Sequence, residues 1–195
     1  MPNRSDQRKQ LRKQRASLDP TERLQRSRHL CQRLMQHHLF RNSRRIAAYL
    51  AADGEIDAHP LIETAWATGK QVYLPVLRPF GGNRLWFARY EPDTPLVTNR
   101  YGIAEPDINH RQRIEAFALD LVLAPLVGFD ARGNRLGMGG GFYDRSFSHL
   151  LCRRHWLKPR LIGLAFDFQQ VSRLPTQRWD VPLTAVATEN RVTEF

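Results

Sequence analysis

Short apolar runs recur along the chain, separated by segments in which apolar positions follow helical spacing. Runs with the length and composition of strands cover residues 45–52, 70–77, 121–129, 160–166 and part of 181–188. Residues 85–90 alternate like a further strand at a sheet edge. Because strands and helices alternate, the pattern predicts an α/β fold, a three-layer α/β/α sandwich with a largely parallel central sheet.

The predicted helices are marked by their composition and by their ends. Residues 4–17 contain neither Pro nor Gly and many good helix formers. Asp19 begins the next helix, because it can accept hydrogen bonds as an N-cap and is followed by a proline at the first helical position. Residues 60–66 form a third helix that Gly69 ends, and residues 143–155 also have helical spacing.

Composition limits the class of protein. The 195 residues, 42% of them hydrophobic, suit a single globular domain over residues 1–195. The apolar runs are far shorter than a membrane span, and the basic, polar N-terminus predicts no signal peptide. Cys31 and Cys152 give no disulfide framework or metal pattern, which favours a reducing cytoplasm. His37 and His38 have no third metal ligand near them in sequence, so we interpret them as ordinary helix residues.

Positive charge is concentrated at the N-terminal end. The formal net charge is +11, and residues 1–45 hold 13 of the 30 Lys and Arg but only 3 of the 19 Asp and Glu. The basic helical arm at about residues 1–18 has three interpretations. It is a nucleic-acid-binding segment, a solvated helix face, or an arm folded over an anionic small molecule.

A glycine-rich segment follows the predicted strand at 121–129, and residues 130–145 read DARGNRLGMGGGFYDR. A strand, a glycine-rich loop and a helix start together form a phosphate cradle, because backbone N–H groups converge there and the helix start is positive. Arg135 and Arg145 flank the glycines with charges suited to phosphate oxygens, and Asp144 suits a Mg²⁺ bridge. The loop matches neither a Walker A sequence nor the dinucleotide-binding fingerprint. These residues predict phosphoryl transfer that depends on positioning and charge neutralisation.

Residues 133–144, GNRLGMGGGFYD, closely resemble the signature of the 5-formyltetrahydrofolate cyclo-ligase family, also called methenyltetrahydrofolate synthetase. The resemblance continues in residues 8–12, where Arg8 replaces the family's usual Lys, and in residues 99–106 and 174–183. It implies ATP-dependent cyclisation of 5-formyltetrahydrofolate to 5,10-methenyltetrahydrofolate, with release of ADP and phosphate, through an N5-iminium phosphate. It also implies a NagB/RpiA/CoA-transferase-like architecture and a cytoplasmic enzyme with ATP as co-substrate and Mg²⁺ as cofactor.

The resemblance further implies which residues bind each substrate. Nucleotide-binding residues are expected at Arg8, Arg12, Arg135, Leu136, Gly137, Met138, Gly139, Gly140, Gly141, Phe142 and Tyr143. Folate-binding residues are expected at Leu50, Glu55, Tyr101, Met138 and Phe142. The carboxylate of Glu55 would accept hydrogen bonds from the N–H donors of the pterin.

Two carboxylates, Asp144 and Asp180, are the expected metal ligands, although a helix cap or a salt bridge to Arg178 is an equally open interpretation for Asp180. Asp144 and Arg145 are the expected catalytic residues, with the arginine neutralising developing charge. The expected partners are ATP and 5-formyltetrahydrofolate, with or without a polyglutamate tail; no membrane or nucleic-acid partner is expected. The alternatives are a nucleic-acid-binding protein that uses the basic arm, another ATP-dependent phosphoryl-transfer enzyme, or a folate binder without turnover.

Overall fold

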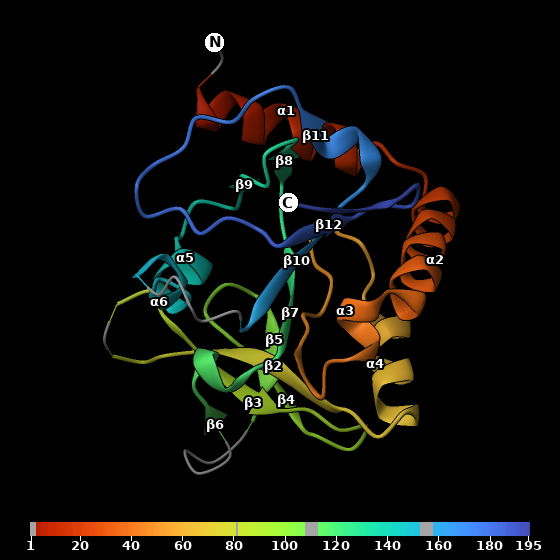
Figure 1. Ribbon diagram of the computed structural model, residues 1–195, viewed down its shortest axis with the longest axis vertical. Coiled ribbons are helices and arrows are strands. Elements are labelled where there is room, and N and C mark those ends of the chain that lie inside the picture. The colour runs from red at the N-terminus through yellow and green to blue at the C-terminus, as the bar shows by residue number, and fades with distance from the viewer. Residues whose placement is uncertain (1–2, 81, 108–112, 153–157) are drawn as a thin grey trace.

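The computed structural model describes residues 3–80, 82–107, 113–152 and 158–195 (Figure 1). Its largest element is an eight-stranded sheet with the order β13, β12, β10, β7, β1, β2, β3, β6. The strands are β1 (Arg45–Ala47), β2 (Gln71–Leu77), β3 (Leu85–Arg89), β6 (Arg113–Ile114), β7 (Leu121–Pro125), β10 (Arg160–Leu164), β12 (Ala185–Ala187) and β13 (Val192–Glu194). The strands from β12 to β2 pair in parallel, and antiparallel strands lie at both edges. This mostly parallel central sheet confirms the predicted α/β fold.

Helices cover both faces of this sheet. They are α2 (Pro20–Gln36), α3 (His38–Arg41) and α4 (His59–Ala67) on one face, and η2 (Ala116–Ala118), α5 (Phe142–Ser146) and α6 (His149–Cys152) on the other. In β7, Leu121 and Leu123 pack in the cluster that contains α2 and α4, whereas Val122 and Ala124 pack in the cluster that contains Phe147. Successive side chains of a strand point to opposite faces, so a wholly apolar strand needs cover on both sides. The NagB/RpiA/CoA-transferase-like comparison stays a prediction.

The basic N-terminal arm is a docked helix. Helix α1 (Arg4–Ala16), within the predicted range 4–17, lies over a small sheet of β11 (Gln170–Val171), β8 (Gly128–Asp130) and β9 (Arg135–Leu136) (Figure 1). Leu11 packs there with Val127, Leu136 and Leu174 in a separate buried cluster. This apolar contact holds the helix against the segment that carries the glycine-rich loop.

Several strands differ from their predicted ranges. The run at 121–129 leaves the main sheet at Pro125, which has no N–H to donate, and continues as β8. The predicted run at 45–52 is a strand only in β1, and the segment at 181–188 holds only the short β12. The sequence did not predict β13, nor β6, which pairs with β3 and removes β3 from the sheet edge. A separate hairpin consists of β4 (Leu96–Thr98) and β5 (Ala104–Pro106).

The helix predicted over residues 143–155 is broken into α5 and α6, and residues 153–155 lie outside the described part of the chain. The Ser146 hydroxyl donates to the Phe142 carbonyl at 2.7 Å and accepts from the Leu85 N–H at 2.9 Å. It thereby competes for helical hydrogen bonds and ties the end of α5 to β3. A short 3₁₀ helix, η3 (Asp167–Gln169), precedes β11. Among the described residues no helix is long and apolar enough to cross a membrane.

Candidate functional site

A cavity of about 810 Å³ lies between α1, the glycine-rich loop, the segment after β1 and the β4–β5 hairpin. Most residues predicted from the sequence line it: Arg8, Arg12, Leu50, Glu55, Tyr101, Arg135, Gly137, Met138, Gly139, Gly140, Gly141, Phe142, Tyr143, Asp144 and Asp180. Leu136 instead packs into the buried cluster beneath α1. The fold therefore brings segments that are far apart in sequence to one cavity.

The hairpin that carries Arg135 is held by a buried carboxylate. Asp130 is fully buried, and its side chain accepts hydrogen bonds from the N–H groups of Arg132, Asn134 and Leu174 at 3.0–3.1 Å. Burial would raise the pKa of Asp130, but these bonds and one from the Asn134 amide outweigh it and hold the pKa below its ordinary value. Asp130 is thus an ionised support that fixes the turn between β8 and β9.

Two of the four glycines after Arg135 adopt backbone conformations that other residues rarely take. Gly139 and Gly141 have φ angles of 107° and 67°. A Cβ placed on Gly137 would meet no atom within 4 Å, so this part of the loop borders open space. The Gly140 carbonyl accepts from the Asn83 amide at 2.8 Å and from the Arg145 guanidinium at 2.7 Å.

Arg145 does not line the cavity, and its guanidinium is instead hydrogen-bonded to the Gly140 carbonyl. The five-residue α5 that follows is too short for its dipole to supply much positive charge. Neutralisation of a bound phosphate chain at this loop would therefore fall mainly to the arginines that face the cavity.

Arg135 and Asp144 form the central ion pair of the loop. The guanidinium of Arg135 donates to Oδ1 of Asp144 at 2.6 Å and lies 5.2 Å from the centre of the Tyr143 ring. The N–H of Val181 also donates to Oδ1, at 3.2 Å. Among the described residues, none donates a hydrogen bond to Oδ2 of Asp144, so this oxygen can accept another ligand. Burial raises the pKa of Tyr143, and its phenol is neutral at physiological pH.

Four arginines of α1 lie on one helical face, at positions 4, 8, 12 and 15. Arg4 binds both carboxylate oxygens of Asp180, at 2.8 and 3.4 Å, and the Gln177 N–H donates to the same group. Arg8 donates to the Gly137 carbonyl at 2.8 Å. The ion-pair partner of Asp180 is therefore Arg4, in place of the neighbouring arginine considered from the sequence. Arg4, Arg8 and Arg12 of the basic arm thus line the cavity, whereas Lys9 and Lys13 are exposed.

Arg12 reaches the segment after β1, where its Nε donates to Oδ2 of Asp53 at 2.9 Å. Burial acts to raise the pKa of Asp53, but the hydrogen bonds from Arg12 and Arg15 outweigh it and lower the pKa. The sequence reasoning missed Arg4, Arg15 and Asp53. The recurrence of Arg every three or four positions was the signal that could have identified the two arginines.

Glu55 lines the cavity from the segment after β1, and its side chain is only 13% exposed. Burial raises the pKa of Glu55, while Arg15 and the Ala52 N–H, which donates to Oε2 at 3.3 Å, oppose the rise. The cavity is also lined by many apolar side chains, which include Leu50, Leu74, Pro75, Leu77, Leu85 and Ile103. The ring of Tyr101 packs edge-on against Phe142 at 5.7 Å. An apolar wall with a carboxylate suits a flat heterocycle that carries N–H donors.

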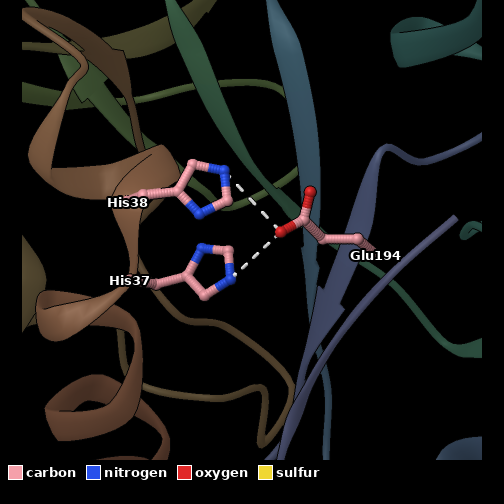
Figure 2. A group of neighbouring side chains, drawn as sticks. All are labelled: His37, His38 and Glu194. Atoms are coloured by element: carbon pink, nitrogen blue, oxygen red, sulfur yellow. Dashed lines mark ion pairs between the residues drawn. The ribbon is translucent and has the colours of Figure 1, made fainter.

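A separate cluster away from the cavity joins His37 and His38 to Glu194 of β13, as Figure 2 shows. The Nε2 atoms of the two rings lie 3.4 and 3.7 Å from Oε1 of Glu194. Glu194, from the far end of the chain, is thus a third side chain of a kind that can bind a metal, which the sequence near the two histidines lacks. However, the Leu39 N–H donates to Nδ1 of His37 at 3.4 Å, so a neutral His37 carries its hydrogen on Nε2, the atom that lies nearest Glu194. We interpret the cluster as a clasp in which two imidazoles lie beside one carboxylate.

Comparison with known proteins gives a consistent result. The model of the 5-formyltetrahydrofolate cyclo-ligase family matches residues 1–189. The chain is 41% identical over 185 residues to 5-formyltetrahydrofolate cyclo-ligase from Escherichia coli K12, covering 95% of this chain and 100% of that protein. It is 44% identical over 178 residues to the Haemophilus influenzae protein of the same name, covering 90% and 92%. The NMR structure of Aquifex aeolicus 5,10-methenyltetrahydrofolate synthetase has a TM-score of 0.81 and 31% identity, and the match covers 98% of this chain and 92% of that one.

Proposed function

Because the chain belongs to the 5-formyltetrahydrofolate cyclo-ligase family, we propose that it converts 5-formyltetrahydrofolate and ATP to 5,10-methenyltetrahydrofolate, ADP and phosphate. One observation carries the proposal: a single cavity is lined by a glycine loop with arginines and also by Glu55 with many apolar side chains. A reaction between ATP and a folate needs a phosphate-binding end and a heterocycle-binding end that meet.

In the proposed reaction the formyl oxygen attacks the γ-phosphorus of ATP, and the bond from that phosphorus to the bridging oxygen of ADP breaks. The product is an N5-iminium phosphate. The N10 lone pair then forms a bond to the activated carbon, the carbon–oxygen bond breaks, phosphate leaves, and N10 loses its proton. No side chain has to form a covalent bond, so the protein contributes positioning and charge neutralisation.

The proposal divides the cavity into a phosphate end, formed by the glycine loop and the arginines, and a folate end, formed by Glu55 and the apolar side chains. Arg8, Arg12 and Arg135 bind the phosphate oxygens together with the N–H groups of the loop. Glu55 accepts hydrogen bonds from the pterin, Leu50 and Tyr101 contact the pterin, and Met138 and Phe142 lie where the two substrates meet. Tyr143 packs beside the nucleotide. Arg145 neutralises developing charge, which requires its guanidinium to exchange the Gly140 carbonyl for a phosphate oxygen.

Mg²⁺ fits the residues of this site. The ion usually binds one or two carboxylates together with waters and substrate phosphates. Asp144 has an oxygen without a hydrogen bond from the described residues, whereas Asp180 could bind only after Arg4 moves. We therefore propose Asp144 as the main ligand and Asp180 as the secondary one. Bound there, Mg²⁺ would supply neutralisation of the phosphate charge.

The test is a direct absorbance assay for methenyltetrahydrofolate with purified protein, 5-formyltetrahydrofolate and Mg²⁺, run with and without ATP. Product that forms only with ATP is the expected result. Failure to form product while ATP still binds would overturn the folate reaction and favour another phosphoryl-transfer substrate. Failure to bind ATP would overturn the assignment of the loop itself.

A further inference from the structure

Arg15 is a buried arginine that the proposed reaction does not use. Its side chain is 1% exposed and does not line the cavity. One Nη atom donates to Oδ2 of Asp53 at 2.7 Å, and the other lies 3.8 Å from Oε1 of Glu55 and donates to the Leu126 carbonyl at 3.4 Å. A buried guanidinium is costly unless it is paired, so this location needs an explanation.

The backbone between the two carboxylates has an unusual conformation. Asp53 and Gly54 have consecutive positive φ angles of 51° and 72°, and the Glu55 N–H donates back to the Ala52 carbonyl at 3.0 Å. Residues other than glycine rarely adopt such a conformation unless the surroundings impose it. Here the turn lies directly against α1, since a Cβ on Gly54 would be 3.7 Å from Cγ of Arg15. The turn brings both flanking carboxylates to the same guanidinium.

We propose that Arg15 is a positioning residue for folate: from behind the cavity wall it keeps the Glu55 carboxylate ionised and correctly oriented for the N–H donors of the pterin. This inference rests on the proposed role of Glu55. It assigns to α1 a second task besides contacting the phosphates of ATP. Arg15 acts through Glu55 and does not touch the substrate.

The groups around Glu55 support this assignment. Arg15 faces it from α1, Asp53 is its neighbour on the turn, and the phenols of Tyr49, in the segment after β1, and of Tyr143, in α5, also lie near it. Burial raises the pKa of both phenols, so they are neutral and add no negative charge beside Glu55. Burial raises the pKa of Glu55 as well, and the negative charge of Asp53 raises it further. Arg15 is the largest influence that lowers it. A neutral Glu55 would present an O–H donor where the pterin needs an acceptor.

The experiment measures the dissociation constant of 5-formyltetrahydrofolate by calorimetry between pH 6 and pH 9, together with the KM values for both substrates. Arg15→Met should weaken folate binding by up to about tenfold toward the acidic end of this range, because a nearby opposite charge has an effect of that size on carboxyl ionisation. Binding should recover as the pH rises and Glu55 ionises. The KM for ATP should change less than about threefold. Arg15→Lys keeps the charge and should restore most of the binding at the acidic end.

A double-mutant cycle with Glu55→Gln provides the decisive comparison. With Glu55 already uncharged, loss of Arg15 should cost little further folate affinity, so the two effects should not add. Additive effects, or a loss that is equal at every pH and for both substrates, would overturn the proposal and indicate a purely structural role. Should Arg15→Met fail to melt cooperatively, the same cycle is run with Arg15→Lys, which should show a smaller change in the same direction.

Arg26→Met is the matched control, because Arg26 also forms ion pairs, with Glu22 and Glu189, but does not line the cavity. It should change the melting temperature without changing the pH dependence of folate binding. A shift of that pH dependence in Arg26→Met would also overturn the proposal. Wild-type protein that binds 5-formyltetrahydrofolate but forms no methenyl product would overturn the proposed reaction, while the binding experiment would still decide the role of Arg15.

Discussion

The proposed phosphate end and the proposed folate end of the cavity hold charge in different ways. At the phosphate end the cations lie in the wall and are paired with acids of the protein, Arg4 with Asp180 and Arg135 with Asp144. At the folate end the carboxylate of Glu55 lies in a largely apolar wall, with its cation behind it. At the phosphate end, a bound phosphate can take the place of a protein carboxylate beside an arginine. At the folate end, the negative charge of Glu55 is already set by Arg15 before a ligand binds.

This difference indicates how each end would recognise its ligand. The ion pair of Arg4 and Asp180 is partly exposed and contributes little net stability, so a phosphate oxygen can replace this protein carboxylate at small cost. A buried carboxylate gains more from each hydrogen bond, because it has already lost its contact with water. Changes at the phosphate end should therefore affect ATP, metal and salt dependence. Changes at the folate end should affect folate affinity and its pH dependence.

The largest effect is expected at the phosphate end, from Asp144→Asn. Loss of the proposed Mg²⁺ ligand should lower kcat by about 100-fold or more, with folate affinity largely kept. Steady-state kinetics and calorimetry with 5-formyltetrahydrofolate check both parts. Asp180→Asn should have a smaller effect, because Arg4 already occupies that carboxylate. Unchanged turnover in Asp144→Asn would refute the metal assignment.

Glu55→Gln should show the difference between the two ends most clearly, because it should change the KM for folate and not the KM for ATP. It is expected to raise the KM for folate about 10- to 100-fold, since a buried carboxylate that accepts hydrogen bonds is replaced by an amide, while the KM for ATP stays within about twofold. The pKa of Glu55 is raised, so wild-type folate binding should weaken as the pH falls and the carboxylate takes up a proton. The variant should lose this pH dependence. Equal changes for ATP and folate would remove the distinction between the two ends.

Arg8→Gln should have a moderate effect confined to ATP. Burial lowers the pKa of Arg8, nearby Arg4 lowers it further and Asp180 opposes this, but the guanidinium stays charged. Its loss should raise the KM for ATP about three- to tenfold and reduce the dependence of that KM on salt. Lys9→Gln is the control, because Lys9 is exposed on the same helix and does not line the cavity. Identical behaviour of the two variants would mean that α1 acts only through its overall charge.

The sequence predicted the parts of the fold and site that depend on local composition. Apolar runs identify strands such as β7 and β10 because a strand buried on both faces has few polar positions. The glycine-rich loop was recognisable because residues 137–141 contain four glycines, more than a simple turn needs. Both features are properties of short segments, so they can be recognised without knowing what lies opposite them.

The remaining features depend on contacts between distant segments. The strand β13 has three residues and becomes a strand only by pairing with β12. Arg15 resembles the other arginines of a basic helix, and only the packing of α1 on the turn at 53–54 buries it. The ion pair between Arg4 and Asp180 joins the two ends of the chain in the same way. Such pairings follow from the assembled fold and leave little mark on the local sequence.

The smallest effect is expected outside the cavity, at the clasp of His37, His38 and Glu194. Burial lowers the pKa of His37, the neighbouring His38 lowers it further, and Glu194 opposes this. Because the pKa in the folded state lies below that in the unfolded state, the unfolded chain binds more protons in this window, so His37 should reduce stability as the pH falls below about 6.5.

Melting temperatures measured at pH 7.5 and pH 5.5 test this sign. His37→Gln should lose about 1–3 °C less than the wild type on acidification, in keeping with a change of less than about 1 kcal/mol in a chain of this size. His59→Gln is the control, since His59 lies 3.5 Å from Glu63 in an exposed pair on one helix. If the melting temperature of His37→Gln falls on acidification by as much as that of the wild type, His37 does not contribute to the pH dependence of stability.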